Sequence, residues 1–177
     1  MKWLAMVFVL LVTASTASAG TITFELLPGT GAIEGEAGST IGWGYTVTNN
    51  SADWLELTGI SAEPFQYATP DSGPFDYAFV APGETHTVAY DASTPAGLYQ
   101  LTWDPLAPIG FTNTGTFVLT AAYWDADPFA GGAFVSDAPT QSAAYSATVS
   151  TVPEPATLLL MGAGAGIGAL VRRRRSI

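Results

Sequence analysis

The chain holds few residues that can do chemistry. His86 is its one histidine, and it has no cysteine among 177 residues. A Ser-His-Asp arrangement needs a base beside its nucleophile, but His86 is in phase with Val88 and Tyr90 near the start of a predicted strand. That placement indicates a structural histidine at the rim of a core. GxSxG and HExxH sequences are absent, and a phosphate-binding glycine-rich loop would need a lysine that residues 20–151 lack. The sequence therefore predicts a protein that is not an enzyme.

Closely spaced carboxylates are the second kind of candidate. Glu34 and Glu36 form one pair, and Asp125 and Asp127 form another. Two carboxylates can serve glycoside hydrolysis, but neither spacing fixes the required geometry, so we expect no hydrolase. Oxygen ligands from acidic loops suit Ca²⁺. Asp125 and Asp127 are therefore weak calcium candidates, although Ser136 stands where an EF-hand loop needs its last glutamate.

Aromatic side chains are the third kind, because exposed rings can stack on sugars. The part of the chain between its two ends holds Trp43, Trp54, Trp103 and Trp124. Most aromatic residues occupy core positions of predicted strands. Trp54 and Trp124 are out of phase or next to acidic loops, so they are the tryptophans expected to be exposed. A carbohydrate-binding surface is thus an open alternative.

Charge excludes one class of partner. All five basic residues are at the ends of the chain: Lys2, Arg172, Arg173, Arg174 and Arg175. Of the 15 acidic residues only Glu154 lies outside residues 20–151, which leaves 14 there and no lysine or arginine. A region this acidic cannot neutralise phosphates, so nucleic-acid binding is excluded. Anionic lipid headgroups are disfavoured for the same reason.

The elements that position these residues follow a period of two. Apolar residues alternate with small or polar ones in eight segments, which is the pattern of half-buried strands. Turn residues separate the segments, and no window shows a convincing helical stripe. The predicted strands are 21–27, 40–48, 54–60, 75–79, 86–90, 99–103, 115–125 and 145–149.

Short alternating strands at this spacing predict one all-β domain of about 132 residues, large enough to bury a core. We expect a single antiparallel β-sandwich, immunoglobulin-like, over residues 20–151. A jelly roll or a small barrel is the alternative. The sequence YTVTNN at 45–50 resembles a strand and turn of immunoglobulin-like modules in bacterial surface proteins.

The N-terminal residues 1–19 predict a secretory signal peptide. Lys2 gives the positive start, residues 3–12 are continuously apolar, and Ala17 and Ala19 form a small-x-small cleavage site. Cleavage there makes Gly20 the new N-terminus. The chain is therefore expected to be exported, in a compartment where disulfides are available but not required.

The C-terminal residues 152–177 combine three features. A Pro-Glu-Pro motif comes first, residues 156–171 then carry no charge, and four arginines follow. As a helix, the apolar segment would rise about 24 Å, somewhat short of a ~30 Å hydrocarbon core. The arginines would stay on the cytoplasmic side. We expect a short transmembrane helix that anchors the precursor.

This order of motif, helix and arginine cluster resembles the PEP-CTERM sorting domain of Gram-negative bacteria, a tail also named after the C-terminus of certain ice-binding-type surface proteins. The part of the chain before it, for example in GLYQLTWD and GTFVLTA, resembles uncharacterised ectodomains that precede such tails. The resemblance implies export by the secretion machinery, recognition by an exosortase, and cleavage near the motif. The sorting residues that it implies are Val152, Pro153, Glu154 and Pro155, followed by Arg172, Arg173, Arg174 and Arg175.

Together these features predict an exported, exosortase-processed protein of the cell surface or extracellular matrix. Its membrane-anchored precursor carries a structural or interaction β-sandwich. The resemblance implies association with exopolysaccharide or a biofilm. A carbohydrate- or calcium-binding extracellular module is the alternative.

Overall fold

The computed structural model describes residues 21–151. The predicted signal peptide, its cleavage site at Ala17, Ala19 and Gly20, and the predicted membrane helix lie outside the described residues. So do the sorting residues 152–155 and 172–175. No helix within residues 21–151 is long and apolar enough to cross a membrane.

The described chain contains eleven strands and one 3-10 helix, joined by turns and loops. Residues rich in Thr, Val, Tyr, Trp and Phe favour strands. In chain order the elements are β1 (Ile22–Leu27), β2 (Ala32–Glu36), β3 (Thr40–Asn49), β4 (Trp54–Ala62), β5 (Ala68–Asp71), β6 (Phe79–Val80), β7 (Thr85–Val88), β8 (Tyr99–Trp103), β9 (Thr112–Trp124), η1 (Pro128–Ala130), β10 (Phe134–Asp137) and β11 (Gln141–Ser150).

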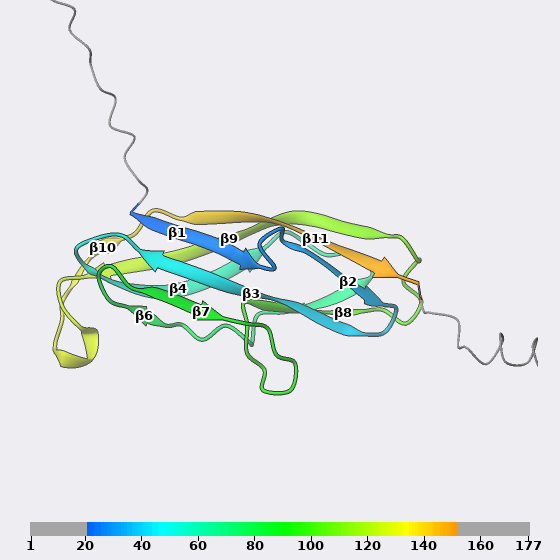
Figure 1. Ribbon diagram of the computed structural model, residues 1–177, viewed down its shortest axis with the longest axis horizontal. Helices are drawn as coiled ribbons and strands as arrows, with labels where there is room; N and C mark the ends of the chain where they lie inside the picture. Colours follow the sequence, from blue (N-terminus) through cyan, green and yellow to red (C-terminus); the bar gives the residue numbers. More distant parts are fainter. Residues whose placement is uncertain (1–20, 152–177) are drawn as a thin grey trace, which may run out of the picture.

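Two sheets lie face to face (Figure 1). One has the order β1-β3-β8-β5, and β7 pairs with the end of β3 beside β8. The other has the order β2-β11-β9-β4-β6, and β10 pairs with β9 beyond the end of β11. The predicted β-sandwich is therefore confirmed.

The core lies between the two sheets and is largely aromatic. Trp43 of β3 packs its ring against Phe117 of β9 at 5.0 Å and against Tyr145 of β11 at 5.4 Å between centroids. Trp43 and Phe117 are fully buried. Trp103 is buried as well, so both tryptophans predicted for the core are in it. Truncating such a ring to alanine typically costs about 3–5 kcal/mol.

The connection from β1 to β2 carries the chain from one sheet to the other. Gly31 makes this turn with φ +66°, and a Cβ on it would lie 2.3 Å from the Ala144 carbonyl oxygen, so only glycine fits. The Trp43 indole donates to the Gly31 carbonyl at 2.8 Å. Beyond the turn, β2 pairs with β11 in parallel. The sandwich is thus mixed, where the sequence predicted antiparallel pairing only.

Three strands were not predicted, because each lacks an apolar stripe. β2 has one large apolar residue, Ile33, and β10 is exposed along its whole length. β5 contains Pro70, yet it is an edge strand of its sheet, where a residue without an amide proton is tolerated. Backbone pairing to β11, β9 and β8 holds these strands, and only Ile33 of β2 and Ala68 of β5 add contacts with the core.

The predicted strand at 75–79 is wrong for most of its length. Only Phe79–Val80 pairs, with β4. Tyr77 has φ +49°, which breaks the extended backbone, so Phe75 is buried and Tyr77 is exposed. Tyr90, expected to continue the face of His86, likewise lies beyond the end of β7.

Candidate functional site

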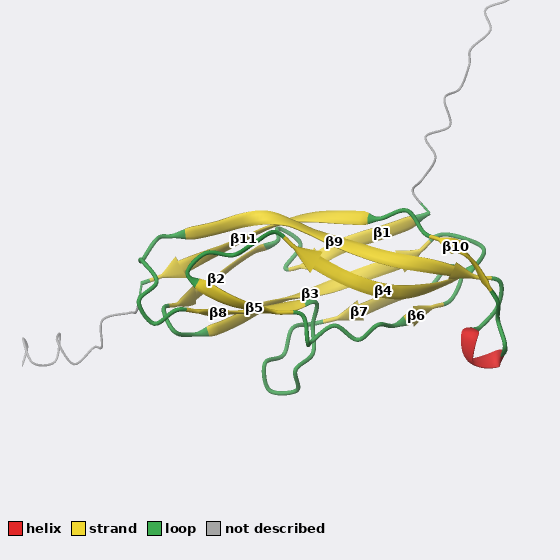
Figure 2. Ribbon diagram, turned by 180° about the vertical axis from the view of Figure 1, so that it is seen from behind, coloured by secondary structure: helices red, strands yellow, loops and turns green. Residues whose placement is uncertain are grey.

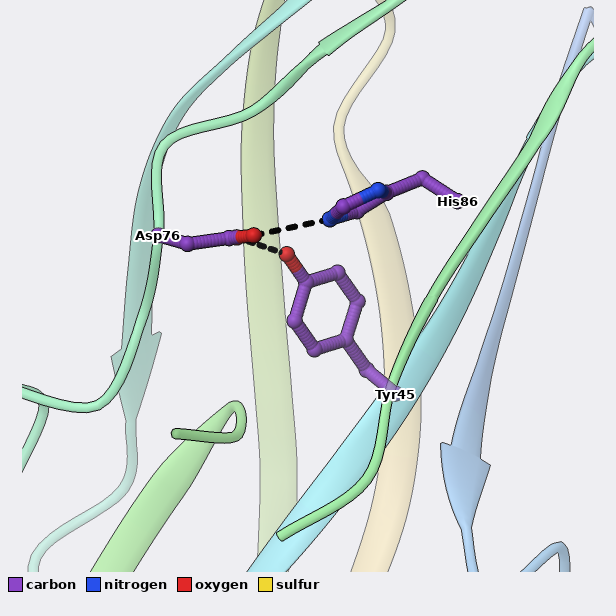
Figure 3. Close-up of polar contacts among 3 residues, drawn as sticks. All are labelled: Tyr45, Asp76 and His86. Atoms are coloured by element: carbon purple, nitrogen blue, oxygen red, sulfur yellow. Dashed lines mark hydrogen bonds and ion pairs between the residues drawn. The ribbon is translucent and has the colours of Figure 1, made fainter. Parts of the chain in front are cut away.

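Three polar side chains meet where the edge strand β7 faces the segment before β6 (Figure 3). Tyr45 comes from β3, His86 from β7, and Asp76 from the loop that precedes β6 in the opposite sheet. The Tyr45 hydroxyl donates to Asp76 Oδ1, and His86 Nε2 lies 2.8 Å from Asp76 Oδ2. We call these three residues the Asp76 clasp, because they join the two sheets at their edge.

Burial dominates the electrostatics of the clasp. Tyr45 is fully buried, whereas the His86 and Asp76 side chains are about one third exposed, at 30% and 39%. Burial, and then the hydrogen bond and negative charge of Asp76, raise the pKa of the Tyr45 hydroxyl far above its ordinary value. Tyr45 therefore stays protonated at any physiological pH.

The order of the three groups suits structure better than catalysis. In a hydrolytic triad the histidine lies between nucleophile and carboxylate and takes the proton of the nucleophile. In the clasp the carboxylate of Asp76 lies between Tyr45 and His86 and holds the tyrosine proton in place. The Tyr45 ring also packs against Phe75 at 5.6 Å and against the His86 ring at 5.8 Å. His86 is thus a half-buried rim histidine, as its sequence position indicated.

A cluster of rings lies elsewhere, on the outer face of the six-stranded sheet. Trp54 of β4 and Phe134 of β10 both stand opposite Trp124 of β9 in the strand register. Phe79 of β6 lies in the next row, and Phe129 of η1 packs its edge against Phe79 at 4.9 Å and 71°. We call these five residues the aromatic end.

The ring of Trp124 has a fixed orientation. Its indole nitrogen donates to Glu56 Oε2 at 2.8 Å, and Phe134 meets it edge-on at 6.2 Å and 86°. Trp54 and Trp124 are half-buried, so the predicted exposure of these two tryptophans holds in part. Phe129 is 84% exposed and Phe134 is 55% exposed.

Asp125 and Asp127, the weak calcium candidates, shape the loop that carries Phe129. Asp127 Oδ1 accepts the Phe129 amide proton at 2.9 Å, and Asp125 Oδ1 accepts that of Ala133 at 2.7 Å. Gly131 closes the turn with φ +96°. These carboxylates act as caps for backbone N–H groups.

The other acidic pair stands apart from both clusters. Glu34 and Glu36 are exposed on one face of β2. Within residues 21–151, no three histidine or carboxylate side chains lie close enough to hold a metal ion.

Sequence reasoning did not find the clasp or most of the aromatic end. Asp76 falls within the predicted strand 75–79, and nothing local ties it to residues ten and thirty-one positions away. Phe129 and Phe134 did carry a signal. They are large apolar side chains in a stretch of Asp, Pro, Gly and Ala where a turn needs none.

Comparison with known proteins identifies the tail. Residues 151–175 match the family model of the PEP-CTERM protein-sorting motif. This confirms the resemblance noted from the sequence. The motif marks an exported protein that is made as a membrane-anchored precursor, recognised by an exosortase and processed for the cell surface.

The β-sandwich is distantly similar to two solved structures. The VesB protease of Vibrio cholerae matches 74% of the chain with 15% identity and a TM-score of 0.38, and the chain spans 32% of that protein. A PapD-like domain of human CEP192 matches 84% of the chain, and 96% of its own length, with 6% identity and a TM-score of 0.39. A search of curated proteins finds no match. Since both TM-scores are low, the fold assignment depends on the two sheets alone.

Proposed function

We propose that this protein is a non-catalytic component of the extracellular matrix, released or displayed by an exosortase and associated with exopolysaccharide through its β-sandwich. The observation that carries the proposal is the sorting motif at residues 151–175, which follows the end of β11 directly. After processing, the sandwich would be the functional part.

The polar chemistry of the described residues supports a non-catalytic role. Asp76 uses both carboxylate oxygens on Tyr45 and His86, and the Tyr45 proton is held rather than released. Asp125 and Asp127 are engaged by backbone amides. Of the groups that sequence reasoning considered for chemistry, these contacts involve His86, Asp125 and Asp127, whereas Glu34 and Glu36 are exposed on β2.

The sorting part of the proposal is tested by intact mass. The protein is purified from cells and from the surrounding matrix of the producing bacterium. We expect a matrix form that begins at Gly20 and ends near Pro153–Pro155. Replacing Pro153, Glu154 and Pro155 by alanine should leave unprocessed precursor in the membrane fraction. Normal processing of that variant would refute the role of the motif.

The matrix part is tested by selective digestion. Washed matrix is treated separately with polysaccharide hydrolases, with DNase and with buffer. We expect the hydrolases to release the processed protein and DNase to release no more than buffer does. Retention of the protein after the polysaccharide is digested would contradict association with exopolysaccharide.

A further inference from the structure

The aromatic end exposes rings that folding does not explain. Burying a phenylalanine ring stabilises the folded state relative to leaving the ring in water, yet Phe129 and Phe134 are mainly exposed. The conformation of the loop around Phe129 is fixed by hydrogen bonds to Asp125 and Asp127 and by the turn at Gly131. Clustered exposed apolar groups of this kind mark interaction sites.

Carboxylates stand among the rings. In the strand register Phe79, Glu56, Ala122 and Asp137 form one row across β6, β4, β9 and β10, and Trp54, Trp124 and Phe134 form the next. Glu56 accepts a hydrogen bond from the Trp124 indole with one carboxylate oxygen, and Asp137 is exposed. The core of a protein–protein interface is depleted of charged residues, so this mixture fits a protein partner poorly.

A sugar fits the same mixture well. A pyranose ring presents C–H groups on its faces and hydroxyl groups at its edge. Aromatic rings cover the first, and carboxylate oxygens accept hydrogen bonds from the second. Preset ring orientation, as at Trp124 and Phe134, lowers the entropic cost of binding.

The negative charge of the described residues limits the kind of polysaccharide that can bind. No lysine or arginine occurs in residues 21–151, and Glu56, Asp125, Asp127 and Asp137 lie in or beside the aromatic end. Uronic, sulfated or phosphorylated polymers would be repelled, because like charges brought together without a counter-charge are disfavoured. Neutral polysaccharides carry no charge and would not be repelled.

The aromatic end lies at the opposite end of the sandwich from the last residues of β11. Thr112, where β9 begins, pairs with Thr148 near the end of β11, and Trp124 lies twelve residues further along β9. That length of strand spans about 40 Å. Figures 1 and 2 both place η1 at the end of the sandwich opposite to the end where β11 leaves it.

From these observations we infer that the aromatic end is a binding site for neutral polysaccharide, formed by Trp54, Phe79, Trp124, Phe129 and Phe134 with Glu56 as a hydrogen-bond acceptor. The inference deepens the proposed function and rests on it for the biological source of the polymer. The binding itself is a property of the sandwich and can be tested separately.

The test is affinity electrophoresis of the processed protein in native gels. The gels contain hydroxyethylcellulose, galactomannan or dextran as neutral probes, and alginate as the anionic probe. We expect retardation by at least one neutral probe and none by alginate. Phe129→Ala combined with Phe134→Ala should weaken that retardation about tenfold or more. Leu106→Ala is the matched control, since Leu106 is 93% exposed but lies in the loop beside Gly110, whose amide bonds to Val149 near the tail.

Four outcomes would overturn the inference. They are no retardation by any neutral probe, retardation by alginate alone, retardation that survives the double variant, and an equal loss in Leu106→Ala. Sedimentation of the same samples measures the oligomeric state and so tests whether a second copy of this chain occupies the aromatic end. If the processed protein is a dimer that the double variant dissociates, and no probe retards it, the aromatic end binds a second copy instead. Because processing is measured by mass, failure here leaves the sorting result intact.

Discussion

The Asp76 clasp and the aromatic end use similar residue types for opposite purposes. In the clasp, the tyrosine hydroxyl and the histidine nitrogen converge on one carboxylate, and the Tyr45 ring is covered by Phe75 and His86. At the aromatic end, one indole is satisfied by Glu56, while Phe129 and Phe134 face solvent. The clasp closes the edge of the fold, and the aromatic end leaves part of the surface open.

This difference shows which kind of side-chain cluster indicates a ligand-binding site. Polar groups that satisfy one another stabilise the native state and leave little for a ligand. Exposed rings held by capped loops give little to stability. Variants of the clasp should therefore change stability without changing polysaccharide binding, and variants of the aromatic end should do the reverse.

The largest predicted effect is alkaline destabilisation from the buried tyrosines. Burial raises the pKa of Tyr145 to about 12, with Glu63 adding to the shift, and it raises that of Tyr45 further. A raised folded-state pKa gives stability that is present below pH 10, the unfolded value, and is lost as pH rises above it. At pH 11 each tyrosine should cost about 1.4 kcal/mol of unfolding free energy. Urea unfolding from pH 8 to 11 measures this.

Variants of Tyr45 separate the contribution of the clasp from that of Tyr145. Tyr45→Phe should reduce the steepness of the loss between pH 10 and 11. Tyr67→Phe, which removes a hydroxyl from a side chain that is 48% exposed, is the matched control for the loss of a tyrosine hydroxyl. Equal slopes in the wild type and Tyr45→Phe would mean that the Tyr45 proton is not held by the fold.

Asp76→Ala should have the next largest effect. It leaves the buried Tyr45 hydroxyl without its acceptor and removes the contact of His86, which predicts a loss of about 2 kcal/mol of unfolding free energy at pH 7. Asp104→Ala, at an exposed loop position, is the control and should change it by less than about 0.5 kcal/mol. The gel retardation by neutral polysaccharide should be the same in both variants.

The sequence predicted the sandwich well and the clasp not at all, for one physical reason. Period-two alternation reports burial along a single strand, so β1, β3 and β8, with apolar stripes through Phe24, Trp43 and Leu101, were found close to their observed bounds. Strands that present one apolar residue to the core or none carry no such signal, as β2 and β10 show.

The residues of the two clusters also divide into those that one segment predicts and those that it does not. Trp54 and Trp124 were predicted to be exposed, because they are out of phase or next to acidic loops, and the structure leaves both half-buried. The partners that complete each cluster come from other segments. Phe134 meets Trp124 only through a strand that the sequence did not predict, and Asp76 reaches Tyr45 only because Tyr77, with positive φ, interrupts the expected strand.

A smaller effect tests whether the clasp acts as one unit. Tyr45→Phe removes one hydroxyl and leaves Asp76 bonded to His86, so at pH 7 it should cost about 1 kcal/mol. His86→Ala and the double variant complete a cycle. Since both side chains share Asp76, we expect a coupling energy of at least about 0.5 kcal/mol. Simple additivity would show that Tyr45 and His86 contact Asp76 independently.

Phe129→Ala should have the smallest effect on stability. A small effect would show that the aromatic end, unlike the clasp, does not stabilise the fold. Phe129 is 84% exposed and touches the sheet through the edge of Phe79, so its removal should change the unfolding free energy by less than about 0.5 kcal/mol. The Asp127 cap bonds the backbone amide of residue 129, which alanine retains. Urea unfolding at pH 7 checks this. A loss above 1.5 kcal/mol, in the range of a buried ring, would make Phe129 part of the core and would place the aromatic end, like the clasp, among the structures that hold the fold together.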